Sequence, residues 1–109
     1  MVQIRREWGL IPVLRGNEYE PEFLEKISKN ADKVIVLVII NQEEIGNIPS
    51  GFVGSRIKEL ERVGEQIVEF FRRKGVDVKM VLEWGNPELL INEYVKKEKL
   101  DRVYWRGEV

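Results

Sequence analysis

Seven consecutive apolar residues, Val34 to Ile40, are the feature that most constrains how this chain can fold. The run reads V-I-V-L-V-I-I and is mostly β-branched. It is too short for a buried helix and is typical of a strand that is covered on both faces. A strand of that kind needs a layer of helices above it and another below it. The sequence therefore predicts an α/β fold built on a mostly parallel sheet.

The segments before this run predict a strand followed by a helix. Leu10–Leu14 is a short apolar strand candidate, and residues 1–9 either lead into it or lie along a sheet edge. Its Pro12 lacks a backbone donor, which favours a position at a strand end or a bulge. Pro21 suits the first position of a helix whose apolar positions continue to Ala31. Strand, helix and strand within about thirty residues predict a right-handed βαβ unit.

Residues 41–54 predict a long loop, because they contain three glycines, Pro49 and four bulky apolar side chains. Such a loop is either pinned by its apolar side chains over a helix end or is a lid that contacts a ligand or a partner. Residues 55–74 then predict a long amphipathic helix. Gly64 lies within the apolar stripe of this helix, which predicts a close approach to the sheet, since a glycine within a helix otherwise costs ~1 kcal/mol.

The last third of the chain predicts two more strands around a helix. Residues 76–83 alternate between apolar and charged side chains with Val81 as the exception, which indicates an edge strand with one wetter face. Asn86 and Pro87 predict the cap and first residue of a helix that ends near Lys99, and residues 101–106 predict a short final strand. Strict alternation predicts an open parallel four-stranded sheet of order 3-2-1-4 with helices on both faces. Ligands in this class bind beyond the carboxyl ends of the strands, here between strands one and four.

Composition narrows the classes of protein to which the chain can belong. Its length predicts a single domain, residues 1–109. Lys and Arg number 18 against 19 Asp and Glu, and this balance argues against a nucleic-acid partner. No apolar run approaches the ~20 residues that span a bilayer, and no signal-peptide core begins the chain, so we expect no membrane association and a cytoplasmic location. Abundant Glu, Lys, Arg, Ile and Val without Cys resembles heat-adapted proteins.

The absence of Cys, His and Thr removes much of the chemistry that enzymes use. Thiol chemistry, disulfides, histidine acid–base catalysis and the usual transition-metal sites all need these side chains. Neither a phosphate-binding G-x-x-x-x-G-K-S/T loop nor a G-x-G-x-x-G turn is present. The carboxylate pairs Glu18 with Glu20 and Glu43 with Glu44 lie in polar stretches, where solvation explains them. We therefore expect no enzyme and no metal site.

The order of the motifs from Leu10 to Gly107 resembles that of a known family. A strand ends in a glycine turn (L-I-P-V-L-R-G-N-E), the buried strand follows, and a long helix ends in R-R-K-G-V-D-V. The next stretch contains a strand, Gly-x-Pro, a helix, Asp and a short apolar strand. This layout resembles the universal stress protein family, whose α/β domains are adenine nucleotide alpha hydrolase-like. The resemblance implies that fold and a role in stress response.

Two departures from the family bear on function. Nucleotide-binding members carry an Asp at the end of the first strand, where this chain has Leu14 or Arg15. They also follow the fourth strand with Gly-x-x-Gly, nine residues and Gly-Ser or Gly-Thr, whose backbone N–H groups hold phosphates. This chain ends two residues after Gly107, so it resembles a shortened member that lacks the C-terminal nucleotide-binding motif. Gly54-Ser55 is the comparable helix start, either a plain N-cap or an anion site.

The first functional expectation is a non-catalytic domain that acts through protein association as a homodimer. Members of the family often dimerise through a fifth strand, and without it the fourth strand is left as an edge that carries Val103, Tyr104 and Trp105. An exposed edge with aromatic side chains is a pairing hazard or a pairing site. We expect a partner chain or residues 1–9 to cover this edge.

The alternative expectation is an adenine-nucleotide-binding stress-response protein with a reduced site. Its arginines would meet the phosphate charge of ATP or AMP without a glycine loop. On the first expectation the chain needs no cofactor. The residues of the reduced site would be Arg15, Gly16, Ile39, Ile40, Arg106 and Gly107.

Overall fold

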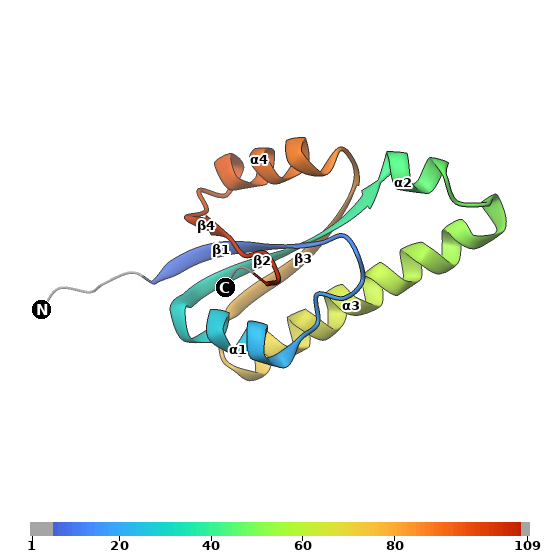
Figure 1. Ribbon diagram of the computed structural model, residues 1–109. Helices are drawn as coiled ribbons and strands as arrows, with labels where there is room; N and C mark the ends of the chain where they lie inside the picture. Colours follow the sequence, from blue (N-terminus) through green and yellow to red (C-terminus); the bar gives the residue numbers. More distant parts are fainter. Residues whose placement is uncertain (1–5, 108–109) are drawn as a thin grey trace, which may run out of the picture.

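The computed structural model describes residues 6–107, and it contains a parallel four-stranded sheet (Figure 1). The strand order is β3-β2-β1-β4, which confirms the predicted order 3-2-1-4. β2 pairs with β1 on one side and with β3 on the other, and β4 pairs with β1. The strands are β1 (Glu7–Val13), β2 (Ala31–Asn41), β3 (Asp77–Gly85) and β4 (Arg102–Val103).

Helices cover both faces of this sheet, as Figure 1 shows. α1 (Pro21–Asn30) and α3 (Val53–Arg73) pack on one face with alternate residues of β2, from Val34 to Ile40. α4 (Pro87–Lys97) packs on the other face with Ile35, Leu37 and Ile39. The buried run at the centre of the sequence is therefore divided between two cores, as a strand covered on both faces requires. No helix within residues 6–107 is long and apolar enough to cross a membrane.

The helix starts follow the sequence signals closely. Pro21 and Pro87 occupy the first turns of α1 and α4, and the Asn86 side chain accepts a hydrogen bond from the backbone N–H of Leu89. Gly64 lies where α3 approaches the sheet most closely. A Cβ atom there would lie 2.7 Å from the Val38 side chain and 2.8 Å from the sulfur of Met80. The predicted close approach is confirmed.

The prediction of a long loop over residues 41–54 is wrong for much of its length. A short helix α2 (Gln42–Gly46) follows β2 directly, and a 3₁₀ turn η1 (Ser50–Phe52) precedes α3. The Asn41 side chain accepts a hydrogen bond from the N–H of Glu43, so it caps α2. α3 begins at Val53, which places Ser55 inside the helix. Gly54-Ser55 is therefore neither an N-cap nor a helix start.

Pro12 explains why β4 is shorter than predicted. The sequence predicts a strand over residues 101–106, yet β4 has only two residues. The N–H of Tyr104, the residue after β4, donates to the Leu10 carbonyl. The backbone polar groups of Leu10 therefore point toward β4. Residues two apart in a strand have their backbone groups on the same side, so Pro12 also faces β4. Because proline has no N–H, the ladder between β1 and β4 has no donor there and ends.

The start of β1 tests whether residues 1–9 lead into the first strand or lie along a sheet edge. Residues 7–9 belong to β1, so this part of the segment leads into the first strand as one alternative predicted. Residues 1–5, and with them part of that expectation, lie outside the described residues.

Gly9 in β1 makes room for a buried aromatic ring. Tyr104 is only 1% exposed, and its ring lies against Gly9 so closely that a Cβ atom on Gly9 would overlap it. The Tyr104 hydroxyl donates to the Glu7 carboxylate at 2.6 Å. Burial, and then this hydrogen bond, raise the pKa of Tyr104 above its ordinary value, so the hydroxyl stays protonated and can donate. Gly9 thus fixes the position of the chain segment that follows β4.

We predict that Gly9→Ala destabilises the protein by about 1–3 kcal/mol, because the new methyl group overpacks against Tyr104. Urea unfolding followed by circular dichroism measures the change. Gly54→Ala is the matched control, since no atom beyond its chain neighbours and the backbone of its own helix lies within 4 Å of its Cβ position in α3. The control should leave stability unchanged or raise it slightly. Equal stability of the two variants would contradict the close packing of Tyr104 on Gly9.

Candidate functional site

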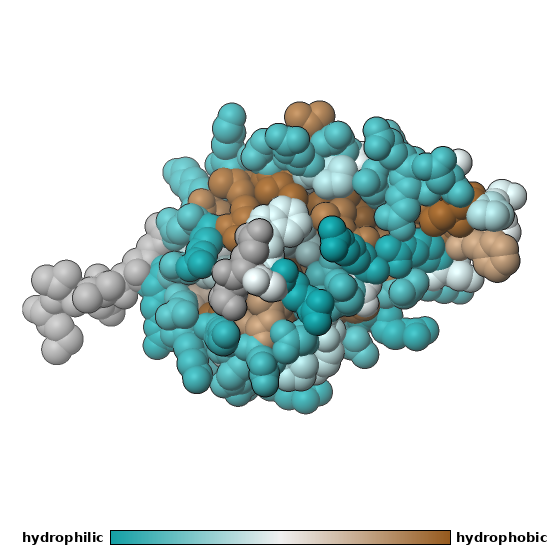
Figure 2. All heavy atoms as spheres, viewed as in Figure 1, coloured by the Kyte–Doolittle hydropathy of each residue, from teal (hydrophilic) through white to brown (hydrophobic). Residues whose placement is uncertain are grey.

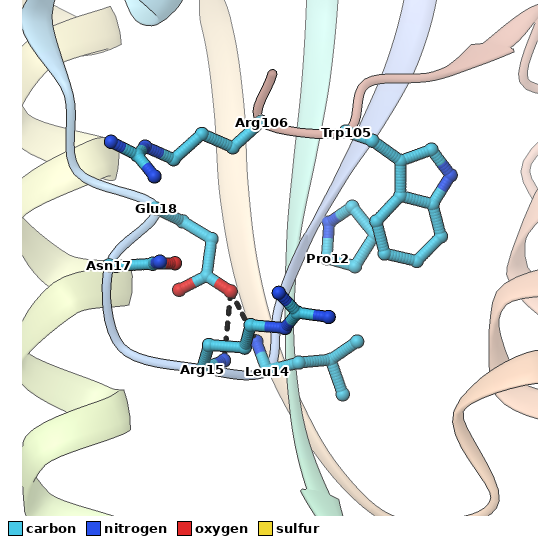
Figure 3. A pocket seen from close by; sticks show the side chains of 7 residues that line it. All are labelled: Pro12, Leu14, Arg15, Asn17, Glu18, Trp105 and Arg106. Carbon is cyan, nitrogen blue, oxygen red and sulfur yellow. Dashed lines mark hydrogen bonds between the residues drawn. The ribbon is translucent and has the colours of Figure 1, made fainter. Parts of the chain in front are cut away.

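A cavity of about 240 Å³ opens where the carboxyl ends of β1 and β4 lie side by side (Figure 3). This is the switch point of the sheet, where the strand order predicts that a ligand would bind. Trp105 and Arg106 line it from the segment after β4, and the other lining residues come from the end of β1 and the loop after it. The lining residues are Pro12, Leu14, Arg15, Asn17, Glu18, Trp105 and Arg106.

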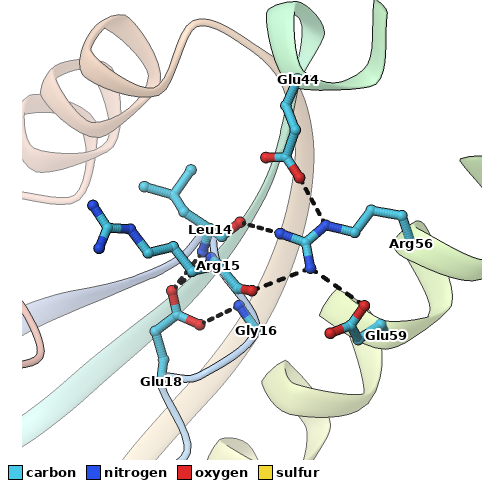
Figure 4. Close-up of polar contacts among 7 residues, drawn as sticks. All are labelled: Leu14, Arg15, Gly16, Glu18, Glu44, Arg56 and Glu59. Carbon is cyan, nitrogen blue, oxygen red and sulfur yellow. Dashed lines mark hydrogen bonds and ion pairs between the residues drawn. The ribbon is translucent and has the colours of Figure 1, made fainter. Parts of the chain in front are cut away.

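Glu18 is the residue around which the loop after β1 is built. Its side chain is 5% exposed, and its carboxylate accepts hydrogen bonds from three successive backbone N–H groups (Figure 4). The donors are Leu14 at 2.8 Å, Arg15 at 2.9 Å and Gly16 at 2.8 Å. Gly16 has a φ of +93°, which lets the loop curl around the carboxylate. Successive N–H groups that converge in this way form a site for an anion. The chain fills this site with its own carboxylate.

Arg56 of α3 holds the same loop from the opposite side. Its guanidinium donates to the Leu14 carbonyl at 3.2 Å and to the Arg15 carbonyl at 3.1 Å. The same group pairs with Glu44 at 2.8 Å and with Glu59 at 3.3 Å (Figure 4). Burial alone would lower the pKa of Arg56, but the hydrogen bonds and charges of Glu44 and Glu59 outweigh it and raise the pKa. Glu18 and Arg56 therefore bind three N–H groups and two carbonyls at the start of this loop from within the chain.

Sequence reasoning missed both of these residues. It treated Glu18 and Glu44 as solvated carboxylates, which is wrong for Glu18 because the side chain is buried, and incomplete for Glu44 because it pairs with Arg56. The available signal was the position of Glu18 just after a strand end and a glycine, where free N–H groups need an acceptor. No local pattern marks the contact of Arg56 with this loop, because the two carbonyls that it binds lie 41 and 42 residues away in the sequence.

The structure brings together only some residues of the predicted nucleotide site. Arg15 and Arg106 both line the cavity. Ile39 and Ile40 are completely buried in the two cores, so neither side chain can contact a ligand in the cavity. Gly16, with its positive φ, forms the turn of the loop after β1. Gly107 has a φ of +93° and lies in a turn at the end of the described residues.

The predicted association surface is also altered by the structure. Tyr104 is buried, so this side chain cannot form part of an exposed edge. Val103 is half-buried and Trp105 is 37% exposed. Both line a groove of about 410 Å³ beside α4, together with Pro87 and Ile91. We call Val103, Trp105, Pro87 and Ile91 the β4 surface. Figure 2 shows apolar side chains gathered between α4 and β4 on the face in view.

The remaining polar groups of the described chain offer no metal site. Among residues 6–107, no group of three or more acidic side chains is placed to hold a metal ion. In the same range, every buried side-chain nitrogen or oxygen has a hydrogen-bond partner. The polar lining of the cavity at the switch point consists of two arginines, the Asn17 amide, the Trp105 indole and the Glu18 carboxylate, which already accepts three hydrogen bonds.

Comparison with known proteins identifies the fold. No family model matches the sequence, and no curated protein matches it either. The chain is similar in structure to the hypothetical protein MJ0577, a test case for the structure-based assignment of biochemical function. The match has a TM-score of 0.65 at 19% identity and covers 90% of this chain and 74% of that chain. The domain therefore has the universal stress protein-like, adenine nucleotide alpha hydrolase-like fold that its layout predicted.

We predict that Glu18→Ala lowers the free energy of unfolding by about 2–3 kcal/mol, because it leaves three backbone N–H groups without their charged acceptor. Urea denaturation of the purified variant gives this value. Glu22→Ala changes an exposed carboxylate in the first turn of α1 and is the matched control. It should stay within about 0.5 kcal/mol of the original protein. A Glu18 variant as stable as this control would refute the loop-closing role.

Proposed function

We propose that this chain is a non-catalytic domain that acts through protein association and works as a homodimer. The observation that carries the proposal is the exposure of apolar side chains along both edges of the sheet. At the β4 surface these are Val103 and Trp105. At the other edge they are the half-buried apolar residues of β3 and the exposed Trp84. Uncovered sheet edges with apolar side chains favour pairing with another chain.

The hydrogen bonds between Glu18 and the loop after β1 support a role without a nucleotide. In domains of this type, free backbone N–H groups at a strand end or helix start hold phosphate. Here the N–H groups of Leu14, Arg15 and Gly16 are already bonded to Glu18. A phosphate would have to displace a buried carboxylate that makes three charge-assisted hydrogen bonds. The proposal therefore includes no ATP or AMP and no catalysis.

We predict that the protein sediments at twice the mass of a single chain in analytical ultracentrifugation. Burial of the apolar edge side chains in a second copy provides the driving force. Phe52→Ser is a useful control, because Phe52 is 65% exposed but lies in η1, away from both sheet edges. This variant should keep the dimer mass. A single-chain mass throughout a concentration series would refute the proposal.

The alternative is binding of an adenine nucleotide, as in a stress-response protein with a reduced site. One observation favours it: the switch-point cavity combines Arg15, Arg106 and Trp105. Arginine side chains bind phosphate in a bidentate manner, and an indole ring can stack on a base. This arrangement supplies charge and a stacking surface without a glycine loop.

On the main proposal, Mg-ATP and AMP should leave the melting temperature unchanged in a thermal-shift titration. The alternative instead predicts a rise of several degrees, since a ligand at about 100 times its dissociation constant adds ~2.7 kcal/mol of stability. In that case Arg15→Ala and Arg106→Ala should abolish the rise. Lys29→Ala, which removes an exposed charge in α1, should retain it.

A further inference from the structure

β3 presents a long edge that nothing in the described part of the chain covers. It has nine residues and pairs along its whole length with β2, while its other side lies at the border of the sheet (Figure 1). Val78, Met80, Val81 and Leu82 are all half-buried, whereas the neighbouring residues of β2 are fully buried. Trp84 is 50% exposed. A long, regular edge without proline is a template for pairing with another strand.

The sequence of β3 is complementary to itself when read in the opposite direction. Counting outward from Val81, Met80 corresponds to Leu82, Lys79 to Glu83, and Val78 to Trp84. Each apolar residue meets an apolar residue, and the one lysine meets a glutamate. A two-fold dimer contact needs a surface that complements itself in this manner.

We propose that two copies of the chain pair antiparallel along their β3 edges, with the two-fold axis at Val81, so that their sheets join into one. The inference rests on the proposed homodimer and assigns its contact surface. The β4 surface of each copy then stays free for a different protein.

The pairing of charged side chains favours the register with its axis at Val81 over the neighbouring registers. With the axis at Val81, Lys79 of each copy lies opposite Glu83 of the other, and such opposite pairs stabilise adjacent strands. An axis at Met80 would place Asp77 opposite Glu83, which brings like charges together. An axis at Lys79 or at Glu83 would oppose two identical charges. The register at Val81 therefore gains two ion pairs and avoids these repulsions.

The two charged side chains are already oriented by α4. Lys79 donates to Glu98 at 2.6 Å, and the Tyr94 hydroxyl donates to Glu83 at 2.9 Å. Lys79 is 51% exposed, so it has room for a second acceptor. Burial and the hydrogen bond to Glu83 raise the pKa of Tyr94 to about 12, so the phenol stays a donor at neutral pH. Glu83 keeps an oxygen for the lysine of the second copy.

The other face of the edge offers a place for Trp84. A groove of about 450 Å³ runs between α3 and the first half of β3, lined by Val68 and Arg72 on the helix and by Val78 and Met80 on the strand. In the proposed register, Trp84 of the second copy lies opposite Val78, at this groove. Its exposed ring would gain apolar contacts there and a guanidinium to stack on. Because the proposed dimer has two-fold symmetry, the contact between Trp84 of one copy and the groove of the other occurs twice.

Cysteine crosslinking tests the position of the axis, since the chain has no cysteine of its own. Directly opposite residues of antiparallel strands have Cα atoms about 4.5–5.5 Å apart, within the range that a disulfide spans. Val81→Cys should therefore form a disulfide-linked dimer on mild oxidation. Val103→Cys, a half-buried valine of the β4 surface, is the matched control and should not. Non-reducing electrophoresis reads both results.

A charge exchange provides a second test that separates assembly from folding. Lys79→Glu should weaken dimerisation about tenfold or more, because two attractive pairs become repulsive. Adding Glu83→Lys to it should restore the dimer, since the pairs re-form in reverse. Loss of the Lys79–Glu98 contact within one chain would not be rescued in this way.

The outcomes distinguish the inference from the proposed function. Crosslinking at Val81 with rescue by the charge exchange supports the β3 contact. A dimeric protein that crosslinks at Val103 and not at Val81 overturns this inference, while the homodimer stands. A protein with the mass of one chain overturns the homodimer itself and the β3 contact with it.

Discussion

The double-sided burial of β2 is the constraint on which the rest of the structure depends. Every side chain from Val34 to Ile40 is removed from water, and burial of each such side chain contributes roughly 1.5–3 kcal/mol. Successive side chains of a strand point to opposite faces, so this energy is gained only if both faces are covered. α1 and α3 supply one cover and α4 supplies the other. The position of the cavity at the ends of β1 and β4 follows from this layered arrangement.

Polar groups at the end of β1 impose the second constraint. A chain that leaves a strand and turns beside a buried core must pair its N–H and C=O groups. Glu18 accepts from the donors of the loop, and Arg56 donates to its acceptors. The Glu18 carboxylate thus occupies the anion site that the N–H groups of this loop form. Under the proposed function, this internal carboxylate is the reason why the loop binds no phosphate.

The two edges of the sheet differ in structure. Pro12 interrupts the ladder between β1 and β4, so β4 is short and its neighbourhood offers a side-chain groove instead of a backbone edge. β3 has no such interruption and offers nine residues of regular edge. The antiparallel contact that we propose uses the regular β3 edge. On the same proposal, the groove that contains Trp105 stays free.

The sequence by itself determined the elements whose signals are local and periodic. The apolar run of β2, the alternation of β3 and the prolines at the starts of α1 and α4 each follow from spacing along the chain, and together they predicted the strand order. Gly64 likewise predicted the close approach of α3 to the sheet, since a glycine in the apolar stripe of a helix is otherwise destabilising. The helix α2 was not predicted, because the three glycines and Pro49 within residues 41–54 indicate a loop.

Only the tertiary structure decided the burial of Glu18, the role of Arg56 and the burial of Tyr104. These depend on contacts across space: Arg56 meets Leu14 over 42 positions, and Tyr104 meets Glu7 over 97. The sequence shows that a residue is Glu or Arg, but it does not show whether the charged side chain is exposed to solvent or buried. Their environment is fixed by which segments the packed cores bring together, and that is a property of the whole fold.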